Sequence, residues 1–187
     1  MGQKGGAYER DFCKRLSLWL SGTDDDLFWR SSMSGGRATV RSRQGKKTAG
    51  HYGDIVATDH RGRKFLKTFT LELKRGYNRC NTALSDLLDV PEEGKPQEIG
   101  MWIRQARESA KLAKSRFWLI VYKKDRRDEI VVMPEACFRH YFLHVEIPYT
   151  CYRGKVRTAA DKILPDTLVF AVRSQAFFSV LRPRDFR

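Results

Sequence analysis

Apolar residues recur along the chain with two different periods. Over residues 7–21 they recur every three or four positions, after a glycine-rich lead and before Ser21-Gly22. This spacing predicts an amphipathic helix. The same spacing predicts a second helix over residues 97–114. The apolar positions are Tyr8, Phe12, Leu16, Trp19 and Leu20 in the first helix and Trp102, Ala106, Ala110 and Ala113 in the second.

Short β-prone runs lie between and after these helices. They cover residues 53–56, 69–74, 117–122, 129–133, 145–147 and 168–172. A charged turn over 123–127 joins two of them as a hairpin. The order helix, two strands, helix, strand, strand predicts an α/β (α+β) fold with a sheet flanked by helices. We expect one domain, 1–187, with a catalytic core over 1–133.

The C-terminal extension, residues 134–187, mixes aromatic runs with strand-like pieces and contains no functional motif. Three uses of it stay open: it completes the sheet, forms a dimer surface, or selects substrate through Arg153, Lys155 and Arg157.

The amino-acid composition, and its charge above all, indicates which kind of molecule the protein binds. The chain has 187 residues, 41% hydrophobic, with 36 Lys plus Arg against 22 Asp plus Glu and a net charge of +14. Such a charge is typical of a protein that binds a polyanion, although acidic membranes and acidic proteins also attract basic surfaces. No apolar run is long enough for a membrane span and no signal-peptide core is present, so we expect a cytoplasmic protein.

Charged residues interrupt two of the β-prone runs where a buried strand would not normally carry them. In Phe69-Thr70-Leu71-Glu72-Leu73-Lys74, strand alternation places Glu72 and Lys74 on the face opposite Leu71 and Leu73. Asp54 stands at the head of the 53–56 run, and pairing of the two strands would bring it to Glu72. Two adjacent carboxylates repel unless a cation lies between them, which points to Mg²⁺ bound by Asp54 and Glu72. Lys74 would then lie beside the metal-bound water. The alternative is an exposed hairpin carrying an ordinary Glu–Lys pair.

Basic residues cluster before and after this motif. The stretch from Arg30 to Gly53 contains six basic residues, five glycines and no acid, and we expect it to grip the DNA backbone; a disordered basic linker is the alternative. A second basic patch follows Lys74. The predicted DNA-binding side chains are Arg30, Arg37, Arg41, Arg43, Lys46 and Lys47 in the first stretch and Arg75 and Arg79 in the second.

Gly53-Asp54-Ile55-Val56 followed by Leu71-Glu72-Leu73-Lys74 resembles the PD-(D/E)XK nuclease superfamily. Gly53 stands where many members have proline, a departure that we expect a turn residue to tolerate. Gly5-Gly6-Ala7-Tyr8-Glu9-Arg10 and the Arg30–Arg37 stretch are similar to the archaeal-type Holliday junction resolvase branch. The resemblance implies a restriction-endonuclease-like mixed sheet.

The same resemblance implies roles for further residues. Glu9 would complete the metal site, Leu73 would lend its carbonyl, Gln105 would contact the site, and Ser32 and Ser34 would contact phosphate. Each has an ordinary alternative: Glu9 is also favoured by the helix dipole, and Gln105 could be a surface residue.

Together these observations predict a metal-dependent deoxyribonuclease, using Mg²⁺ or Mn²⁺, that resembles a Holliday junction resolvase. A resolvase needs paired nicks, so we expect a homodimer. A restriction- or repair-type endonuclease acting on duplex DNA is the first alternative. A non-catalytic nucleic-acid-binding protein is the second.

Overall fold

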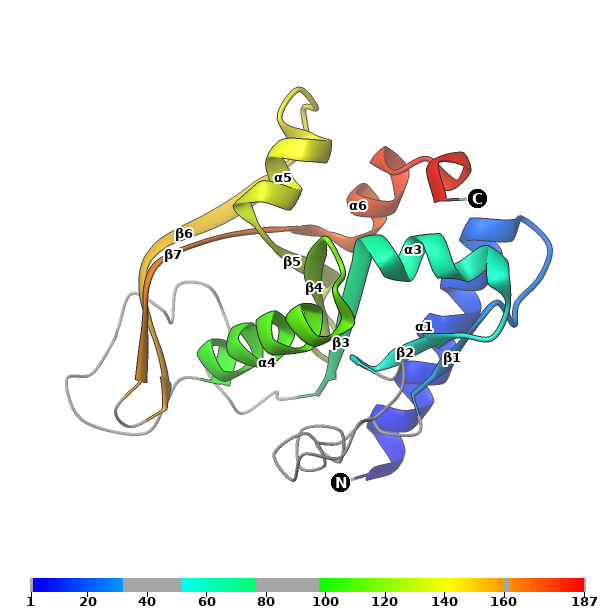
Figure 1. The fold of residues 1–187 in the computed structure, drawn as a ribbon, viewed down its shortest axis with the longest axis horizontal. Coiled ribbons are helices and arrows are strands. Elements are labelled where there is room, and N and C mark those ends of the chain that lie inside the picture. The colour runs from blue at the N-terminus through cyan, green and yellow to red at the C-terminus, as the bar shows by residue number, and fades with distance from the viewer. Residues whose placement is uncertain (1, 32–51, 77–97, 160–161, 187) are drawn as a thin grey trace.

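The computed structural model describes residues 2–31, 52–76, 98–159 and 162–186. Its centre is a five-stranded sheet in the order β3-β4-β5-β7-β6 (Figure 1). The pair β3–β4 is parallel and the other neighbours are antiparallel, so the sheet is mixed. The strands are β3 Phe69–Arg75, β4 Phe117–Lys123, β5 Glu129–Pro134, β6 Tyr149–Ala159 and β7 Lys162–Arg173.

A second, two-stranded sheet lies beside the open edge of β3. It pairs β1 (Phe28–Arg30) with β2 (Ile55–Ala57) in antiparallel register. A short 3₁₀ turn, His60–Gly62, then leads into the helix α3. The predicted α/β sheet flanked by helices is confirmed.

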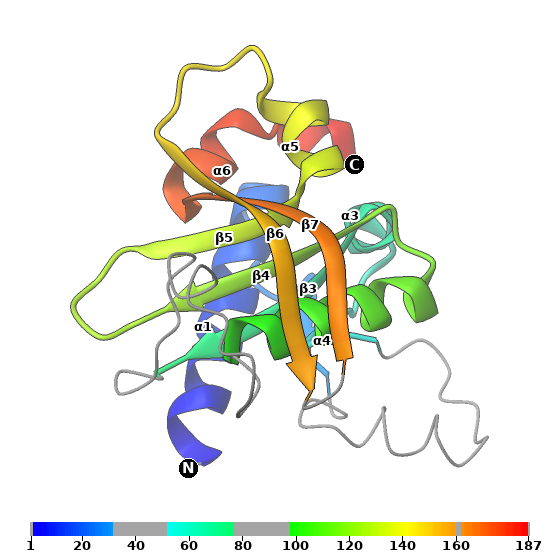
Figure 2. The same cartoon turned by 90° about the vertical axis from the view of Figure 1, so that its left-hand side faces the viewer.

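Helices cover both faces of the large sheet. The helices are α1 Gly2–Ser21, α3 Arg63–Thr68, α4 Glu98–Ala113, α5 Glu135–Phe142 and α6 Ser174–Val180. The residues of α1, α3, α5 and α6 share one apolar core, whereas α4 packs in a second core on the opposite face. Figure 2 shows β6 and β7 curling across α4. In the part of the chain that the structure describes, no helix is long and apolar enough to cross a membrane.

The two predicted helices and five of the six predicted strands lie close to or within observed elements, and the run 168–172 lies inside β7. The expectation for 145–147 was wrong: the amide of Ile147 donates to the carbonyl of Val145 in a local turn, and Pro148, which follows, has no N–H to give to a ladder. The chain instead forms the long β6–β7 hairpin, which adds two strands to the sheet. The helices α3, α5 and α6 were not predicted.

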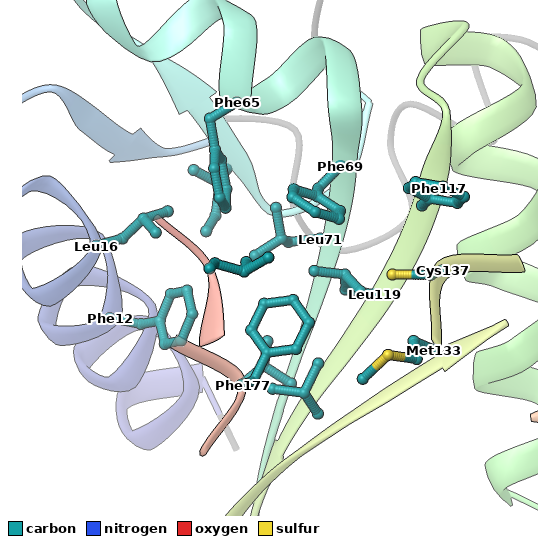
Figure 3. Close-up of a cluster of buried hydrophobic side chains, with 14 of the residues drawn as sticks. Phe12, Leu16, Phe65, Phe69, Leu71, Phe117, Leu119, Met133, Cys137 and Phe177 are labelled. Carbon is teal, nitrogen blue, oxygen red and sulfur yellow. The ribbon is translucent and has the colours of Figure 1, made fainter. Parts of the chain in front are cut away.

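Aromatic side chains form the first core. Phe12 and Leu16 from α1, Phe65 from α3 and Phe69 from β3 point toward one another (Figure 3). The ring of Phe65 is fully buried and contacts four others, those of Trp19, Phe28, Phe69 and Phe186. This ring therefore joins α1, the small sheet, β3 and the C-terminus.

We predict that Phe65→Ala lowers the free energy of unfolding by about 3–5 kcal/mol, because it removes a large ring from a close-packed core. Urea denaturation followed by tryptophan fluorescence measures this loss. Leu18→Ala is the control, because Leu18 lies on α1 and is 45% exposed; its effect should stay within about 0.5 kcal/mol. Equal losses in the two variants would contradict the central position of Phe65.

Candidate active site

Asp54 reaches the open edge of β3 through backbone and side-chain hydrogen bonds. Its amide donates to the carbonyl of Leu71 at 2.9 Å, and its Oδ2 accepts from the amide of Leu73 at 2.7 Å. Both β3 residues therefore present backbone groups to Asp54 on the side away from β4. The two motif runs meet as predicted, but by these bonds and not by a ladder, since β2 pairs with β1.

Gly53 makes this approach possible. Its φ is +80°, and a Cβ placed on it would lie 2.7 Å from the carbonyl oxygen of Leu71 and 2.9 Å from Cγ2 of Thr70. Proline cannot occupy the position, because its ring holds φ near about −65°. The glycine in place of the proline of many superfamily members is thus a requirement of this turn, not a tolerated exchange.

Glu72 is buried beneath α4 and is 1% exposed. Its Oε1 accepts from Oγ of Ser109 at 2.9 Å, and its Oε2 accepts from Nε2 of Gln105 at 2.6 Å. The strand alternation predicted for β3 is confirmed, since Leu71 and Leu73 lie in the core on the other face. The alternative of an exposed hairpin with a Glu–Lys pair is excluded by this burial.

Lys74 completes the same network. Its Nζ lies 3.4 Å from Oε2 of Glu72 and donates to Oε1 of Gln105 at 3.0 Å, with its side chain only 11% exposed. The Gln105 amide therefore bridges the carboxylate and the amine, and the alternative of a surface glutamine is excluded. Ser109 was not among the predicted residues, although it lies one helical turn after Gln105 and so on the same side of α4.

The two carboxyl groups resist ionisation in this setting. Burial and the charge of Asp54 raise the pKa of Glu72 to about 7, although Lys74 and Ser109 oppose the shift. Burial also raises the pKa of Asp54 against the opposing effects of Lys74, the Leu73 amide and Arg30. Two hard oxygen donors that repel each other in a desolvated site suit a divalent cation.

Glu9 lies on α1 and forms an ion pair with Arg30, with Nε and Oε2 3.3 Å apart. A Cβ on Gly6 would lie 2.7 Å from the Arg30 guanidinium, so the glycine leaves room for it. Burial raises the pKa of Cys13 to about 12, and the charges of Glu9 and Asp54 add to the shift, so both carboxylates lie near this thiol. Arg30 also favours ionised Asp54 and therefore acts on both acids.

Of the residues predicted to bind DNA, Arg75 lies at the end of β3 and outside the Glu72 network. Arg75 pairs with Asp125 at 2.6 Å and stands over the ring of Tyr8. Among the described residues, no three His, Cys, Asp or Glu side chains gather closely enough to hold a metal by themselves. Several predicted DNA contacts lie outside the described residues: Ser32, Ser34, Arg37, Arg41, Arg43, Lys46, Lys47 and Arg79.

The model of one protein family, described as "Phage putative PDDEXK endonuclease", matches residues 2–170. The chain belongs to this family. The superfamily resemblance is thereby confirmed, and the chain is a PD-(D/E)XK nuclease. The match continues past the expected core into β6 and β7. Searches of curated proteins and of solved structures gave no match.

The turn at Gly53 gives a prediction for both stability and catalysis. In Gly53→Ala, backbone strain of about 1–2 kcal/mol adds to the clash with Leu71, so the variant should lose stability and cleave DNA more slowly because Asp54 is displaced. Gly22→Ala is the matched control, since Gly22 has φ +86° with open space around it. It should lose stability alone, as thermal unfolding and cleavage rates per folded molecule would show. Undiminished cleavage by Gly53→Ala would contradict the conclusion that Gly53 is required to position Asp54.

Burial of the carboxyls predicts an unusual dependence of stability on pH. The folded protein holds the Glu72 proton more tightly than the unfolded chain between pH 4.5 and about 7. In EDTA, the free energy of unfolding should therefore fall as pH rises through this window, by up to about 1.4 kcal/mol per pH unit from this group.

Urea denaturation across this window, for wild type and Glu72→Gln, isolates the contribution of Glu72. The decline with rising pH should be steeper in wild type than in the variant. Parallel curves would show that Glu72 titrates at an ordinary pKa.

Proposed function

We propose that the protein is a divalent-metal-dependent DNA endonuclease that acts on branched DNA in the manner of a Holliday junction resolvase. One observation supports it above all others: the nuclease motif of this family is assembled around two buried, mutually repelling carboxylates with an amine beside them. The net charge of +14 suits a polyanionic substrate.

The donors at the β3 edge fit Mg²⁺, and also Mn²⁺. Asp54 and Glu72 supply carboxylate oxygens, and the Leu73 carbonyl is proposed as a further oxygen ligand on the edge that faces Asp54. Two carboxylates are sufficient, because Mg²⁺ usually keeps several waters and substrate oxygens. Glu9 supports the site from α1 through Arg30. A bound divalent cation lowers the pKa of its water and neutralises charge on the phosphoryl group.

Three side chains of the protein then position the attacking water, the Lys74 amine and the Glu72 carboxylate. Lys74 orients the attacking water and donates to the phosphoryl oxygens as negative charge builds on them. Gln105 holds the Lys74 amine in place, and Ser109 holds the Glu72 carboxylate. Glu72 cannot change its side-chain conformation without leaving the Gln105 amide and the Ser109 hydroxyl, which both donate to it, unpaired.

The branched-DNA specificity is supported by the N-terminal Gly5–Arg10 and Arg30–Arg37 stretches, which resemble the resolvase branch. A four-way junction is cut by two matched nicks, so we propose a homodimer with two active sites. Arg75 and the basic stretch from Arg30 are proposed to hold the DNA backbone and contribute affinity without reading sequence.

Cleavage of labelled four-way junction, flap, duplex and single-stranded DNA tests the proposal. Symmetric nicking of the junction should require Mg²⁺ and stop in EDTA. Asp54→Asn and Lys74→Ala should each lower the cleavage rate by about 100-fold or more while binding persists. Lys64→Ala, which removes an exposed lysine on α3, is the control and should cleave normally.

Other outcomes select the alternatives. Magnesium-dependent cutting of plain duplex would leave the active site in place but favour a restriction- or repair-type enzyme. Binding without any cleavage by wild type would contradict the catalytic assignment and favour a non-catalytic DNA-binding protein.

A further inference from the structure

A groove runs between α4 and the β6–β7 hairpin, on the side of α4 away from Glu72. Its volume is about 690 Å³. Arg104, Arg107 and Lys111 form the α4 wall, and Thr158, Ile163 and Leu164 form the hairpin wall. We call it the α4–hairpin groove; Figure 2 shows the hairpin crossing the helix.

The α4 wall is strongly cationic. Its three basic side chains face one acid, Glu108, whose Oε1 lies 3.9 Å from Nη1 of Arg104. The Nε of Arg104 is buried and has no hydrogen-bond partner among the described residues. This N–H is therefore able to donate to an acceptor that enters the groove.

The opposite wall is largely apolar. Ile163 is 45% exposed and Leu164 is partly buried beside the second core. A cationic wall facing an apolar wall complements a nucleotide strand, which carries phosphates on one side and flat bases on the other. A cavity of this size accommodates a ligand of one or two nucleotides and is too small for a duplex.

A second cavity, larger than this groove, does not share this character. It measures about 980 Å³ and is lined by four basic and four acidic side chains. Its arginines are paired, as in Arg75–Asp125 at 2.6 Å and Arg173–Asp128 at 3.2 Å. The charges of its lining side chains therefore balance, and the cavity as a whole carries no net charge that would attract an unpaired strand.

The α4 helix links the groove to the active site. Gln105 and Ser109 lie at one margin of its buried face, and Arg104, Arg107 and Lys111 lie at the other. The two margins are separated by about the 10–12 Å diameter of a helix, a distance that a strand of a few nucleotides spans.

We propose that the α4–hairpin groove binds an unpaired DNA strand next to the cleaved phosphodiester. This inference rests on the proposed function and sharpens it: the strand bound here is one that unpairs at the branch point of the DNA, within a few nucleotides of the cut. Arg104, Arg107 and Lys111 contact its phosphates, and the Ile163 wall contacts a base.

Fluorescence anisotropy with a labelled single-stranded oligonucleotide and a labelled duplex, both in EDTA, tests this without cleavage. Arg104→Gln/Lys111→Gln should weaken single-strand binding about tenfold or more and reduce the salt slope by about 1.4, for two lost phosphate contacts. Duplex binding should change much less. Arg139→Gln/Arg182→Gln is the control, because it removes equal charge from exposed positions away from α4.

Ile163→Glu is a second test, since it places a negative charge on the apolar wall at an exposed position. It should also weaken single-strand binding selectively. The groove assignment is overturned if the groove variants bind single strands as the control does, or if they lose duplex binding equally. In those cases persistent magnesium-dependent cleavage by wild type would leave the proposed function standing, whereas wild type that neither binds nor cleaves DNA would remove both.

Discussion

The burial of two carboxylates at the open edge of β3 is the constraint on which the rest of the site depends. Asp54 and Glu72 are 7% and 1% exposed, and the charge of Asp54 adds to the cost of ionising Glu72. Desolvating such a pair opposes folding unless hydrogen bonds and cations compensate it. Hydrogen bonds and positive charges around the pair supply this compensation. They come from the Leu73 amide, Ser109, Gln105, Lys74 and Arg30, so the side chains around the site are arranged to stabilise the two carboxylates.

Three parts of the fold position the carboxylates and their partners: the edge of β3, the helix α4 and the helix α1. The edge position of β3 leaves the backbone of Leu71 and Leu73 open to Asp54, and the positive φ of Gly53 permits the close approach. The α4 helix covers Glu72 from the opposite face, while Glu9 of α1 pairs with Arg30 of β1 beside Asp54. One helix thus serves two purposes, because the margin of α4 away from Glu72 forms the cationic wall of the α4–hairpin groove.

The local pattern of the sequence was sufficient for much of the site. Alternation in β3 placed Glu72 and Lys74 on one face, and the helical repeat placed Gln105 at the margin of the buried face, because both depend only on backbone periodicity. Three features were not predictable in this way. The α3 helix is only six residues long, the β6–β7 hairpin extends well beyond its apolar run, and the Glu9–Arg30 pair joins residues that only the tertiary fold brings together. Gly53 looked like a tolerated exchange until its contact with Leu71 was visible.

Anomalous diffraction from crystals grown with Mn²⁺ tests most directly the proposal that Asp54 and Glu72 bind a divalent metal, because the ion is located without reference to activity. The account predicts one strong anomalous peak within coordination distance of an Asp54 oxygen and a Glu72 oxygen, at the edge of β3 where the Leu73 backbone faces Asp54, and no such peak in crystals of Asp54→Asn. Manganese bound only elsewhere, with Lys74 and Gln105 still closed over Glu72, would contradict it.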